Sequence, residues 1–543
     1  MAHWPTRYTR LDRLFNRFSR LRPGEGRSVL AFFTYALLMM VSYYILKTIR
    51  EPLLLTNSSA EMKSYAYATV ALLLLFIVPL YGLVFRHTGK QQLTRYVTGF
   101  FLLNLAVFYL LGRAGVDIGF AYYVWVGIFS VMITAQFWAF AADSYNVKSG
   151  KRLFPVIMIG ATLGGLAAPS LSGALFPTLG PWNLMLAAMV LLALTLWCVA
   201  WARQAVPPGS GPEPGRPDAP DHGGLLGGFS LVFSDRYLLL VALLIVLLNW
   251  VNTTGEYILA ELVVQHAAGL EGAGSDSVRA EFIAGFYGNF FFTVNLLTLL
   301  LQVFLVARVI RWIGVRGAIL VLPVVTVLGY GLVAFLPVFS LIRVVKILEN
   351  SSDYSLMNTA RHALYLPLSA AKKYEGKTAI EAFFWRFGDL GQAGMIYAGI
   401  HWFAFGIPQF AALNAALSLF WLWVAWQAGR HYGERQDRLV QADLPRLHHR
   451  PRDRHAPPGQ PFEFSLSPET FPDPGEGDVL TFTARVADGG DLPGWLEFFP
   501  ETLTFKGKTP GSAGPETVVI VRATDFDGAW AEGRLVIRHA TYG

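Results

Sequence analysis

Long apolar segments recur from about residue 28 to residue 428, and each has the length of one membrane crossing. A helix needs roughly 20 apolar residues to span the hydrocarbon core of a bilayer. The pattern predicts twelve such helices, over residues 28–46, 64–85, 96–112, 118–142, 153–176, 182–203, 237–260, 282–307, 318–338, 339–363, 378–406 and 408–428. We therefore expect this part of the chain to be an all-α polytopic membrane protein.

The pattern changes near residue 460, where short runs alternate apolar and polar side chains between Gly, Pro and Asp positions. Residues 480–486 and 517–523 are two such runs. Alternation with a period of two is typical of strands that bury one face, so we expect a small all-β sandwich over 460–543. A basic linker, 429–459, precedes it.

Lys and Arg collect in every second loop between the predicted spans, which is typical of loops on the cytoplasmic side. These residues are Arg86, Lys90, Arg95, Lys148, Lys151, Arg152, Arg308, Arg311, Arg316, Lys372, Lys373 and Lys377. The segment 1–27 is rich in Arg and lacks an apolar core, so we interpret it as a retained cytoplasmic segment and not as a signal peptide. We expect both ends of the chain to be cytoplasmic.

A Pro- and Gly-rich stretch, 207–224, divides the spans six and six and predicts a flexible linker, 204–236, between the halves 28–203 and 237–428. Gly89 and Gly314 stand in similar basic loops 225 positions apart, and Gly150 and Gly376 repeat another motif at 226. Such repeats indicate two related six-helix bundles, the layout of major facilitator carriers. The loop residues that we expect to control the motion of the halves are Arg86, Gly89, Lys90, Lys151, Arg311, Gly314 and Lys377.

The composition excludes an ordinary soluble enzyme, because 54% of the 543 residues are hydrophobic and only 15% are charged. The net charge is +7 although the tail 461–543 is acidic, so the basic charge belongs to the membrane part. The single cysteine, Cys198, lies in an apolar run, which excludes an intrachain disulfide. There is no Gly-x-x-x-x-Gly-Lys-Ser/Thr motif and no Ser/His constellation in the spans, so we expect neither an ATPase nor an enzyme. We also expect no metal, no cofactor and no nucleic-acid partner.

Charged residues inside spans are costly unless they face a cavity or a partner, so they are candidates for function. Near the end of the first span, Lys47, Arg50 and Glu51 share one side of the helix with Tyr43 and Tyr44. The alternative is that Lys47 and Arg50 extend to the outer surface. Cations at an outward end, however, oppose the positive-inside trend, which favours a role in solute binding.

Three further spans carry polar stripes. They hold Arg343, Lys346, Glu349, Asn350, Asp353 and Arg361 in the tenth; Asn249, Asn252, Thr253, Thr254, Gly255, Glu256 and Glu261 in the seventh; and Glu381, Arg386, Asp389 and Gln392 in the eleventh. We interpret the stripes as parts of a solute site, with Arg386 and Asp389 also candidates for conformational control. The alternative is that these residues only pair with one another, as Arg386 and Asp389 would. We expect the run Thr253–Gly255 to interrupt its helix at membrane depth.

This mixture of charges favours an anionic solute. Cations from both halves, Lys47 and Arg50 with Lys346 and Arg361, are expected to converge on one cavity, where they would grip phosphate. Nearby acids, Glu51, Glu256 or Asp353, would take these cations as partners when the site is empty, which favours exchange over leak. Aromatic residues make up 14% of the chain and offer either stacking surfaces for a ring or ordinary packing.

Three stretches identify a family resemblance. They are Tyr44-Ile-Leu-Lys-Thr-Ile-Arg-Glu-Pro-Leu53, Phe137-Trp-Ala-Phe-Ala-Ala-Asp143 followed by Gly150-Lys151-Arg152-Leu-Phe-Pro155, and Asp353-Tyr-Ser-Leu-Met-Asn-Thr-Ala-Arg361 followed by Gly376-Lys377-Thr-Ala-Ile380. Over about residues 28–428 the chain resembles the ATP/ADP translocases of plastids and intracellular bacteria. The resemblance places Lys47, Arg50 and Glu51 on that family's basic–basic–acidic triplet and Arg361 on a basic position.

The chain departs from that family's pattern at two positions. Tyr123 in the fourth span and Asn252 in the seventh stand where the family has acidic residues, although Glu256 lies one turn beyond Asn252. The resemblance implies nucleotide-for-nucleotide exchange, and the departures imply a divergent bacterial branch with another anionic solute. Proton-coupled transport of another organic anion is the alternative mechanism.

The tail resembles dystroglycan-type cadherin-like and immunoglobulin-like modules in its Phe471-Pro-Asp473, Leu492-Pro-Gly-Trp495 and Asp525-Phe-Asp527-Gly528 segments. Asp525 and Asp527 offer oxygen ligands of the kind that Ca²⁺ prefers, but an Asp-x-Asp-Gly turn needs no metal. Such modules usually lie outside cells, whereas an even number of spans places this one inside. A non-transporting anchor or sensor that displays the module to a protein partner is therefore the alternative function.

Overall fold

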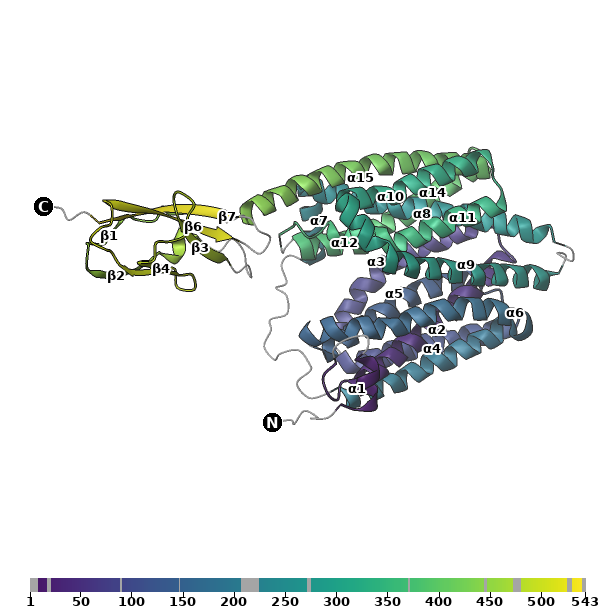
Figure 1. Cartoon of the computed structure of the whole chain (residues 1–543). Coiled ribbons are helices and arrows are strands. Elements are labelled where there is room, and N and C mark those ends of the chain that lie inside the picture. The colour runs from purple at the N-terminus through teal and green to yellow at the C-terminus, as the bar shows by residue number, and fades with distance from the viewer. Residues whose placement is uncertain are drawn as a thin grey trace. The chain divides into compact units, whose positions relative to one another are not determined.

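The computed structural model describes residues 8–16, 21–87, 90–145, 147–206, 224–270, 275–369, 372–443, 447–471, 480–524 and 530–539. The chain divides into two compact units, Met1–Tyr432 and Gly433–Gly543. The first unit is helical and the second is built around β-strands (Figure 1).

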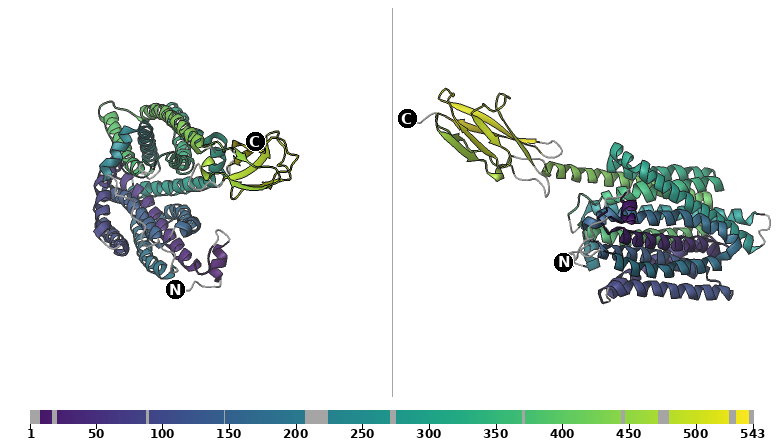
Figure 2. Two further views of the ribbon diagram at one scale, coloured as in Figure 1. Left: turned by 90° about the vertical axis from the view of Figure 1, so that its left-hand side faces the viewer. Right: turned by 60° about the horizontal axis from the view of Figure 1, so that its bottom comes forward.

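The helical unit is a bundle whose long helices run side by side (Figure 2). Its first half contains α1 (Arg10–Phe15), α2 (Gly26–Leu55), α3 (Glu61–His87), α4 (Lys90–Arg113), α5 (Gly119–Ser144) and α6 (Val147–Ala205). After α7 (Gly224–Ser234), the second half contains α8 (Arg236–Ala268), α9 (Asp276–Phe304), α10 (Val306–Phe335), α11 (Phe339–Ser352), α12 (Asn358–Ala363), α13 (Lys377–Ala379), α14 (Trp385–His401) and α15 (Ile407–Asp443). Three π-helical turns, η1 (Asp353–Met357), η2 (Lys372–Gly376) and η3 (Ile380–Phe384), interrupt the second half.

Nine helices of the described chain are long and apolar enough to cross a membrane. One of them, α6, contains two of the predicted spans, because Gly180 adopts a left-handed φ of 68° that bends the chain between them. The predicted spans 339–363 and 378–406 coincide with the segments α11–α12 and α13–α14, which carry more charge. The predicted all-α polytopic membrane protein is thus confirmed. Most of the predicted linker, 207–223, lies outside the described residues.

The expectation that Thr253–Gly255 interrupts its span is wrong, because α8 continues from Arg236 to Ala268. The Thr253 hydroxyl donates to the Asn249 carbonyl at 2.8 Å, so the side chain finds its partner without breaking the helix. Gly255 serves close packing instead: a Cβ there would lie 1.7 Å from the Tyr330 hydroxyl oxygen. The irregular backbone lies in the three π-helical turns, a type of distortion often found at functional sites.

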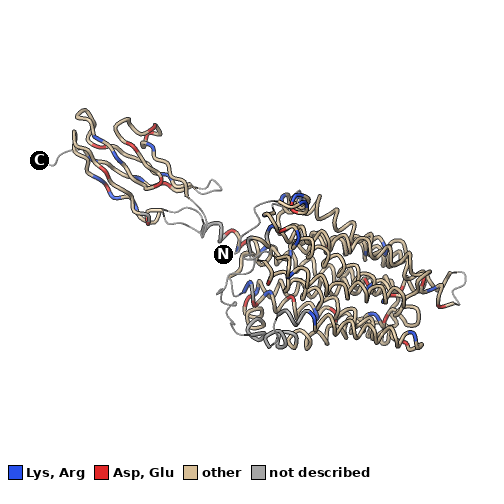
Figure 3. Tube along the Cα trace, turned by 90° about the horizontal axis from the view of Figure 1, so that it is seen from below, with Lys and Arg blue, Asp and Glu red and all other residues tan. Residues whose placement is uncertain are grey.

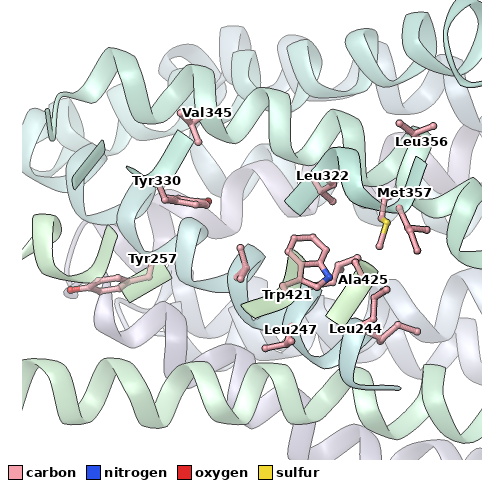
Figure 4. Packing of buried hydrophobic residues seen from close by; sticks show 14 of the residues in the cluster. Leu244, Leu247, Tyr257, Leu322, Tyr330, Val345, Leu356, Met357, Trp421 and Ala425 are labelled. Atoms are coloured by element: carbon pink, nitrogen blue, oxygen red, sulfur yellow. The ribbon is translucent and has the colours of Figure 1, made fainter. Parts of the chain in front are cut away.

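Each half has its own apolar core. In the second half, Trp421 is buried among side chains from several helices, including Leu244 and Leu322 (Figure 4). In the first half, α2, α5 and α6 supply most of a separate core. The halves approach closely where α6 meets α9, since a Cβ on Gly288 would lie 2.6 Å from the Pro169 carbonyl oxygen. Small residues here allow the two backbones to touch.

The short helix α1 is attached to the start of α2 by one buried carboxylate. Asp12 accepts hydrogen bonds from the backbone N–H groups of Thr9 at 2.7 Å, Gly24 at 3.1 Å and Gly26 at 2.7 Å. Burial alone would raise the pKa of Asp12, but these hydrogen bonds outweigh burial and hold the pKa below its ordinary value.

Replacing Asp12 by Ala should therefore loosen the segment that precedes α2, because the buried N–H groups of Gly24 and Gly26 lose their acceptor. We expect a cost of about 1–3 kcal/mol. Since the folded pKa is lowered, the ionised carboxylate contributes its full stability above the unfolded value of about 3.9, and this contribution is lost as the pH falls through the folded value. Hydrogen exchange of residues 8–26 checks both effects, and unchanged protection in the Asp12→Ala protein would contradict them.

The second unit is a two-sheet β structure, as predicted for the end of the chain. Its first strand lies at Arg454–His455, before residue 460, within the segment that was expected to be a linker. One sheet has the order β1 (Arg454–His455), β7 (Trp530–Arg538), β6 (Glu516–Thr524), β3 (Thr481–Val486), and the other has the order β2 (Pro461–Ser465), β5 (Thr504–Lys508), β4 (Leu496–Phe499). Their apolar faces share a core that includes Phe505, Val519 and Leu535. The candidate calcium ligands Asp525 and Asp527 lie outside the described residues.

Candidate functional site

A cavity of about 300 Å³ lies between the two halves of the helical unit. The first half contributes Tyr43, Lys47 and Arg50 of α2, Tyr67 and Val70 of α3, and Tyr123, Gly127, Ser130 and Val131 of α5. The second half contributes Asn249, Asn252, Thr253 and Glu256 of α8, Phe291 of α9, Asn350, Asp353 and Tyr354 around η1, and Trp385, Arg386 and Asp389 of α14. Positions occupied by charged residues are scattered among the mostly uncharged positions of the helices (Figure 3).

A larger cavity, of about 440 Å³, lies near the connection from α2 to α3. Its charged lining residues are the acids Asp117, Asp276 and Glu281. A wall with carboxylates and no Lys or Arg repels anions, so the smaller cavity is the better candidate for an anionic solute.

Lys47 and Arg50 of α2 both line the cavity between the halves. The Lys47 Nζ lies 4.2 Å from the centre of the Phe291 ring, and no ion pair among the described residues includes Lys47. The Arg50 Nε donates to Glu51 at 3.1 Å, and its guanidinium lies 4.2 Å above the Tyr123 ring. Lys47 lies against an aromatic ring and has no carboxylate partner among the described residues, so its charge is available to an anionic ligand.

Lys63 of α3 joins the two halves through buried charges. Its ammonium group lies 3.2 Å from Glu51 of its own half and 3.2 Å from Glu256 of the other half. It donates hydrogen bonds to Glu256 and, at 3.3 Å, to the Tyr287 hydroxyl. Only 1% of Lys63 is exposed, so these contacts are largely shielded from solvent.

The row of charges continues in the second half. Lys346 lies 3.5 Å from Glu256 and 3.1 Å from Glu349, and its Nζ also donates to the Asn252 carbonyl at 3.1 Å. The Tyr330 hydroxyl donates to Glu349. Together with the contacts above, these pairs form an alternating chain, which we call the ion chain. Its members are Arg50, Glu51, Lys63, Glu256, Lys346 and Glu349.

Two of the predicted cations do not lie on the cavity wall. Lys346 is fully buried within the ion chain, behind Glu256. Arg361 of α12 lies with its guanidinium 5.0 Å from the Trp385 ring and donates to Asn358 at 3.0 Å. Lys47 and Arg50 therefore line the cavity directly, whereas Lys346 contacts the lining residue Glu256 and Arg361 lies against the lining residue Trp385.

Polar side chains of the second half complete the opposite wall. The Asn252 amide donates to Asn350 at 3.1 Å, and the Asn350 amide donates to Glu256 at 3.2 Å. Asp353 in η1 is only 6% exposed, and the structure shows no hydrogen bond or ion pair from its carboxylate to any described residue. A buried carboxylate in this situation favours a proton or a ligand donor as its partner.

Arg386 and Asp389 form the ion pair that was the alternative to a solute role. Their closest atoms are 3.6 Å apart, and Asn249 donates to Asp389 at 2.7 Å. Both residues nevertheless line the cavity. Their role in binding or conformational control stays a prediction.

The candidate control residues in the loops are described only in part. Gly89 lies outside the described residues, as do the side chains of Arg86, Lys90 and Lys151. Gly314 adopts a left-handed φ of 67° and bends the chain within α10, next to the exposed Arg311. The Lys377 Nζ lies 5.5 Å from the Tyr365 ring.

Lys63 is the charged residue of the site that the sequence pattern did not single out. It stands directly before the predicted span 64–85, where a Lys is easily interpreted as a solvated loop residue. The available signal was that it follows the first span on the side opposite the basic loops, so that it opposes the positive-inside trend as Lys47 does.

Comparison with curated proteins gives relatives of one kind. The chain is 26% identical over 316 residues to the ADP,ATP carrier protein 1 of Chlamydia pneumoniae, across 50% of this chain and 59% of that protein. It is 27% identical over 302 residues to the ADP,ATP carrier protein 1 of Chlamydia muridarum, across 48% and 54%. The chain is similar to ADP,ATP carriers. It matches less than two thirds of the length of either carrier.

Solved structures extend the similarity to the transporter fold. The nucleoside transporter NupG superposes with a TM-score of 0.53 at 12% identity, over 74% of this chain and 98% of NupG. A POT family transporter in complex with 5-aminolevulinic acid superposes with a TM-score of 0.54 at 11% identity, over 75% and 96%. The predicted two-bundle fold of the major facilitator type is thereby confirmed. At these identities the likeness concerns the fold alone.

The second unit matches a different family. A family model described as "Putative Ig domain" covers residues 445–538. This match agrees with the two-sheet structure and confirms the predicted immunoglobulin-like module. The carrier-like bundle and this module are thus parts of one chain.

Proposed function

We propose that this protein is a secondary carrier that exchanges anionic, nucleotide-like solutes by alternating access. The observation that carries the proposal is Lys47, a cation without a described carboxylate partner in a cavity between two transporter-like halves. The similarity to ADP,ATP carriers supports a nucleotide-like anion. We also propose a bacterial inner membrane with both ends cytoplasmic, which a topology reporter fused after Arg454 would check.

The cavity offers complementary partners for both parts of a nucleotide. Lys47 and the forked guanidinium of Arg50 suit phosphate oxygens. Tyr67, Tyr123 and Trp385 offer aromatic faces on which a planar base can stack. Glu51 neutralises Arg50 in this structure, so an entering phosphate has to compete with that carboxylate.

A second candidate, proton-coupled transport of an organic anion, is favoured by Asp353. Its buried carboxylate lacks a described partner on the cavity wall, and a proton would neutralise it. A non-transporting anchor gains no support from the site, because an anchor has no use for a buried chain of six charges.

Purified protein in liposomes should take up labelled ADP when the liposomes contain ATP or ADP, because each inward step then has an outward partner. We expect uptake at least about tenfold above that of liposomes without internal nucleotide, a ratio that corresponds to 1.4 kcal/mol. An imposed pH gradient distinguishes the mechanisms. Uptake driven by the gradient without internal nucleotide would favour proton coupling, and no movement of any anion would contradict both.

A further inference from the structure

Lys63 makes the buried ionic contact between the halves. Among the described residues, two ion pairs cross from one half to the other: Lys63 with Glu256, and His401 with Glu61. The second of these is partly exposed and depends on protonation of the histidine. The Lys63–Glu256 pair is buried, and Glu256 is itself part of the cavity wall. An attraction between charges is strongest where water is excluded.

This contact can break without leaving an isolated charge in the protein. If the halves separate, Lys63 keeps Glu51 of its own half, 3.2 Å away. Glu256 keeps Lys346 of its own half, 3.5 Å away. Breaking a buried pair is normally costly because one charge is left alone. The ion chain avoids this cost, so the link between the halves is reversible.

The position of Lys63 in this structure corresponds to the closed form of the link. Lys63 donates hydrogen bonds to Glu256 and Tyr287 of the second half. The nearer Glu51 oxygen, Oε2, lies 3.2 Å from the Lys63 Nζ but has no hydrogen-bond partner. The contact between Lys63 and Glu51 is therefore an ion pair without a hydrogen bond. The other oxygen of Glu51 accepts from Arg50. Lys63 therefore shares Glu51 with a cation of the cavity wall.

Binding of an anion at Arg50 would change this sharing. A phosphate that takes Arg50 as its partner leaves the whole charge of Glu51 to Lys63, and an anion next to Glu256 repels that carboxylate. Both effects weaken the link between Lys63 and Glu256. Once the anion leaves, Arg50 can pair with Glu51 and Lys63 with Glu256, as they do in this structure. A ligand shifts a conformational equilibrium only by such a difference in affinity for its two states.

We infer that Lys63 is the positioning residue that makes transport an obligate exchange. It holds the halves together on its side of an empty cavity and releases them when an anion binds Arg50. This inference rests on the proposed anion exchange. Lys63 is not proposed to contact the solute. Lys63 instead determines whether the two halves can move when no solute is bound.

The test compares exchange with net efflux in liposomes loaded with labelled ADP. For the parent we expect efflux into ADP-free medium to be at least about tenfold slower than exchange, the ratio that corresponds to 1.4 kcal/mol. In Lys63→Gln we expect net efflux to approach the exchange rate, because the empty carrier is no longer held closed. Lys63→Arg should restore the parent's ratio. Ser64→Ala removes the neutral hydrogen bond from Gln392 to Ser64 in the next position and should leave the ratio unchanged.

A second measurement does not depend on transport. With Cys198 replaced by Ala and the cavity residue Ser130 replaced by Cys, an impermeant maleimide added on the Lys63 side reports opening on that side. We expect labelling to be about tenfold faster when Lys63→Gln is added, by the same conversion. Equal labelling rates, or an unchanged ratio of efflux to exchange, would overturn the inference. If labelling accelerates while no protein moves ADP, the link stands and the proposed solute fails.

Discussion

Replacing Lys47 by Ala should reduce nucleotide exchange by about 10- to 100-fold, the effect of losing one hydrogen bond to a charged group. Lys47 lines the cavity and has no ion pair with any described residue, so its removal leaves no buried carboxylate behind. The loss should therefore appear in transport and not in folding. Exchange of labelled ADP in liposomes, together with the thermal stability of the purified variant, separates the two effects.

Arg343 provides the matched control for Lys47. It is a cation of α11 that donates to Asn289 at 3.0 Å and does not line the cavity. Arg343→Ala removes the same charge from the helical unit and should leave exchange within about twofold of the parent, since surface changes are usually worth less than 0.5 kcal/mol. Equal loss in the Lys47 and Arg343 variants would mean that net charge, and not the cavity, governs transport.

Gly255→Ala should destabilise the helical unit by roughly 2–6 kcal/mol. A Cβ on Gly255 would lie 1.7 Å from the Tyr330 hydroxyl oxygen and 3.0 Å from the Lys346 Cδ atom. Tyr330 has to move, so its hydrogen bond to the buried Glu349 is lost. Overpacking costs about 1–3 kcal/mol, and the buried Tyr330 hydroxyl, left without its acceptor, costs about 1–3 kcal/mol more. Thermal unfolding in detergent measures the sum.

Gly331→Ala, one residue from Tyr330 in α10, is the control for that substitution. A Cβ on Gly331 meets no atom within 4 Å, so only the helix propensity changes, and Ala is favoured by about 1 kcal/mol. The Gly331 variant should be at least as stable as the parent. A Gly255→Ala protein that unfolds at the parent's temperature would show that Tyr330 can move freely, against the packing that the structure describes.

The spans were predictable because the bilayer imposes a length that the sequence shows directly. The exact ends of the spans were less predictable. Helix α8 runs to Ala268, beyond the predicted end at residue 260, because polar residues near a membrane surface can stay helical. The sequence of Thr253–Gly255 contains two weak helix formers and a glycine, which suggested a break. In the structure the Thr253 and Thr254 hydroxyls donate to carbonyls of the preceding turn, and Gly255 packs against Tyr330, about 75 positions away in the sequence. No local pattern contains that packing contact.

The candidate site was predictable where a charge interrupts an apolar run, as Lys47 and Arg50 do. Lys63 was missed because its position at a span's edge costs little in an isolated helix. Its burial comes from Glu256 and Tyr287 of the other half, which approach only after the bundle assembles. Conversely, Arg361 was expected to face the cavity and is not among its lining residues. Its guanidinium lies 5.0 Å from the Trp385 ring, because neighbouring residues of one helical face can meet different partners.

The six charges of the ion chain sum to zero, three positive and three negative. Moving one elementary charge across a membrane changes the energy by about 2.3 kcal/mol per 100 mV. If these six charges move together, they therefore carry no net charge across the membrane. Voltage would act instead on Lys47 and on the solute, so the electrical work of one cycle would be set by the difference in charge between the two exchanged anions. In a carrier of this kind, the membrane voltage would act on transport through the charges of the exchanged anions and not through the charges of the ion chain.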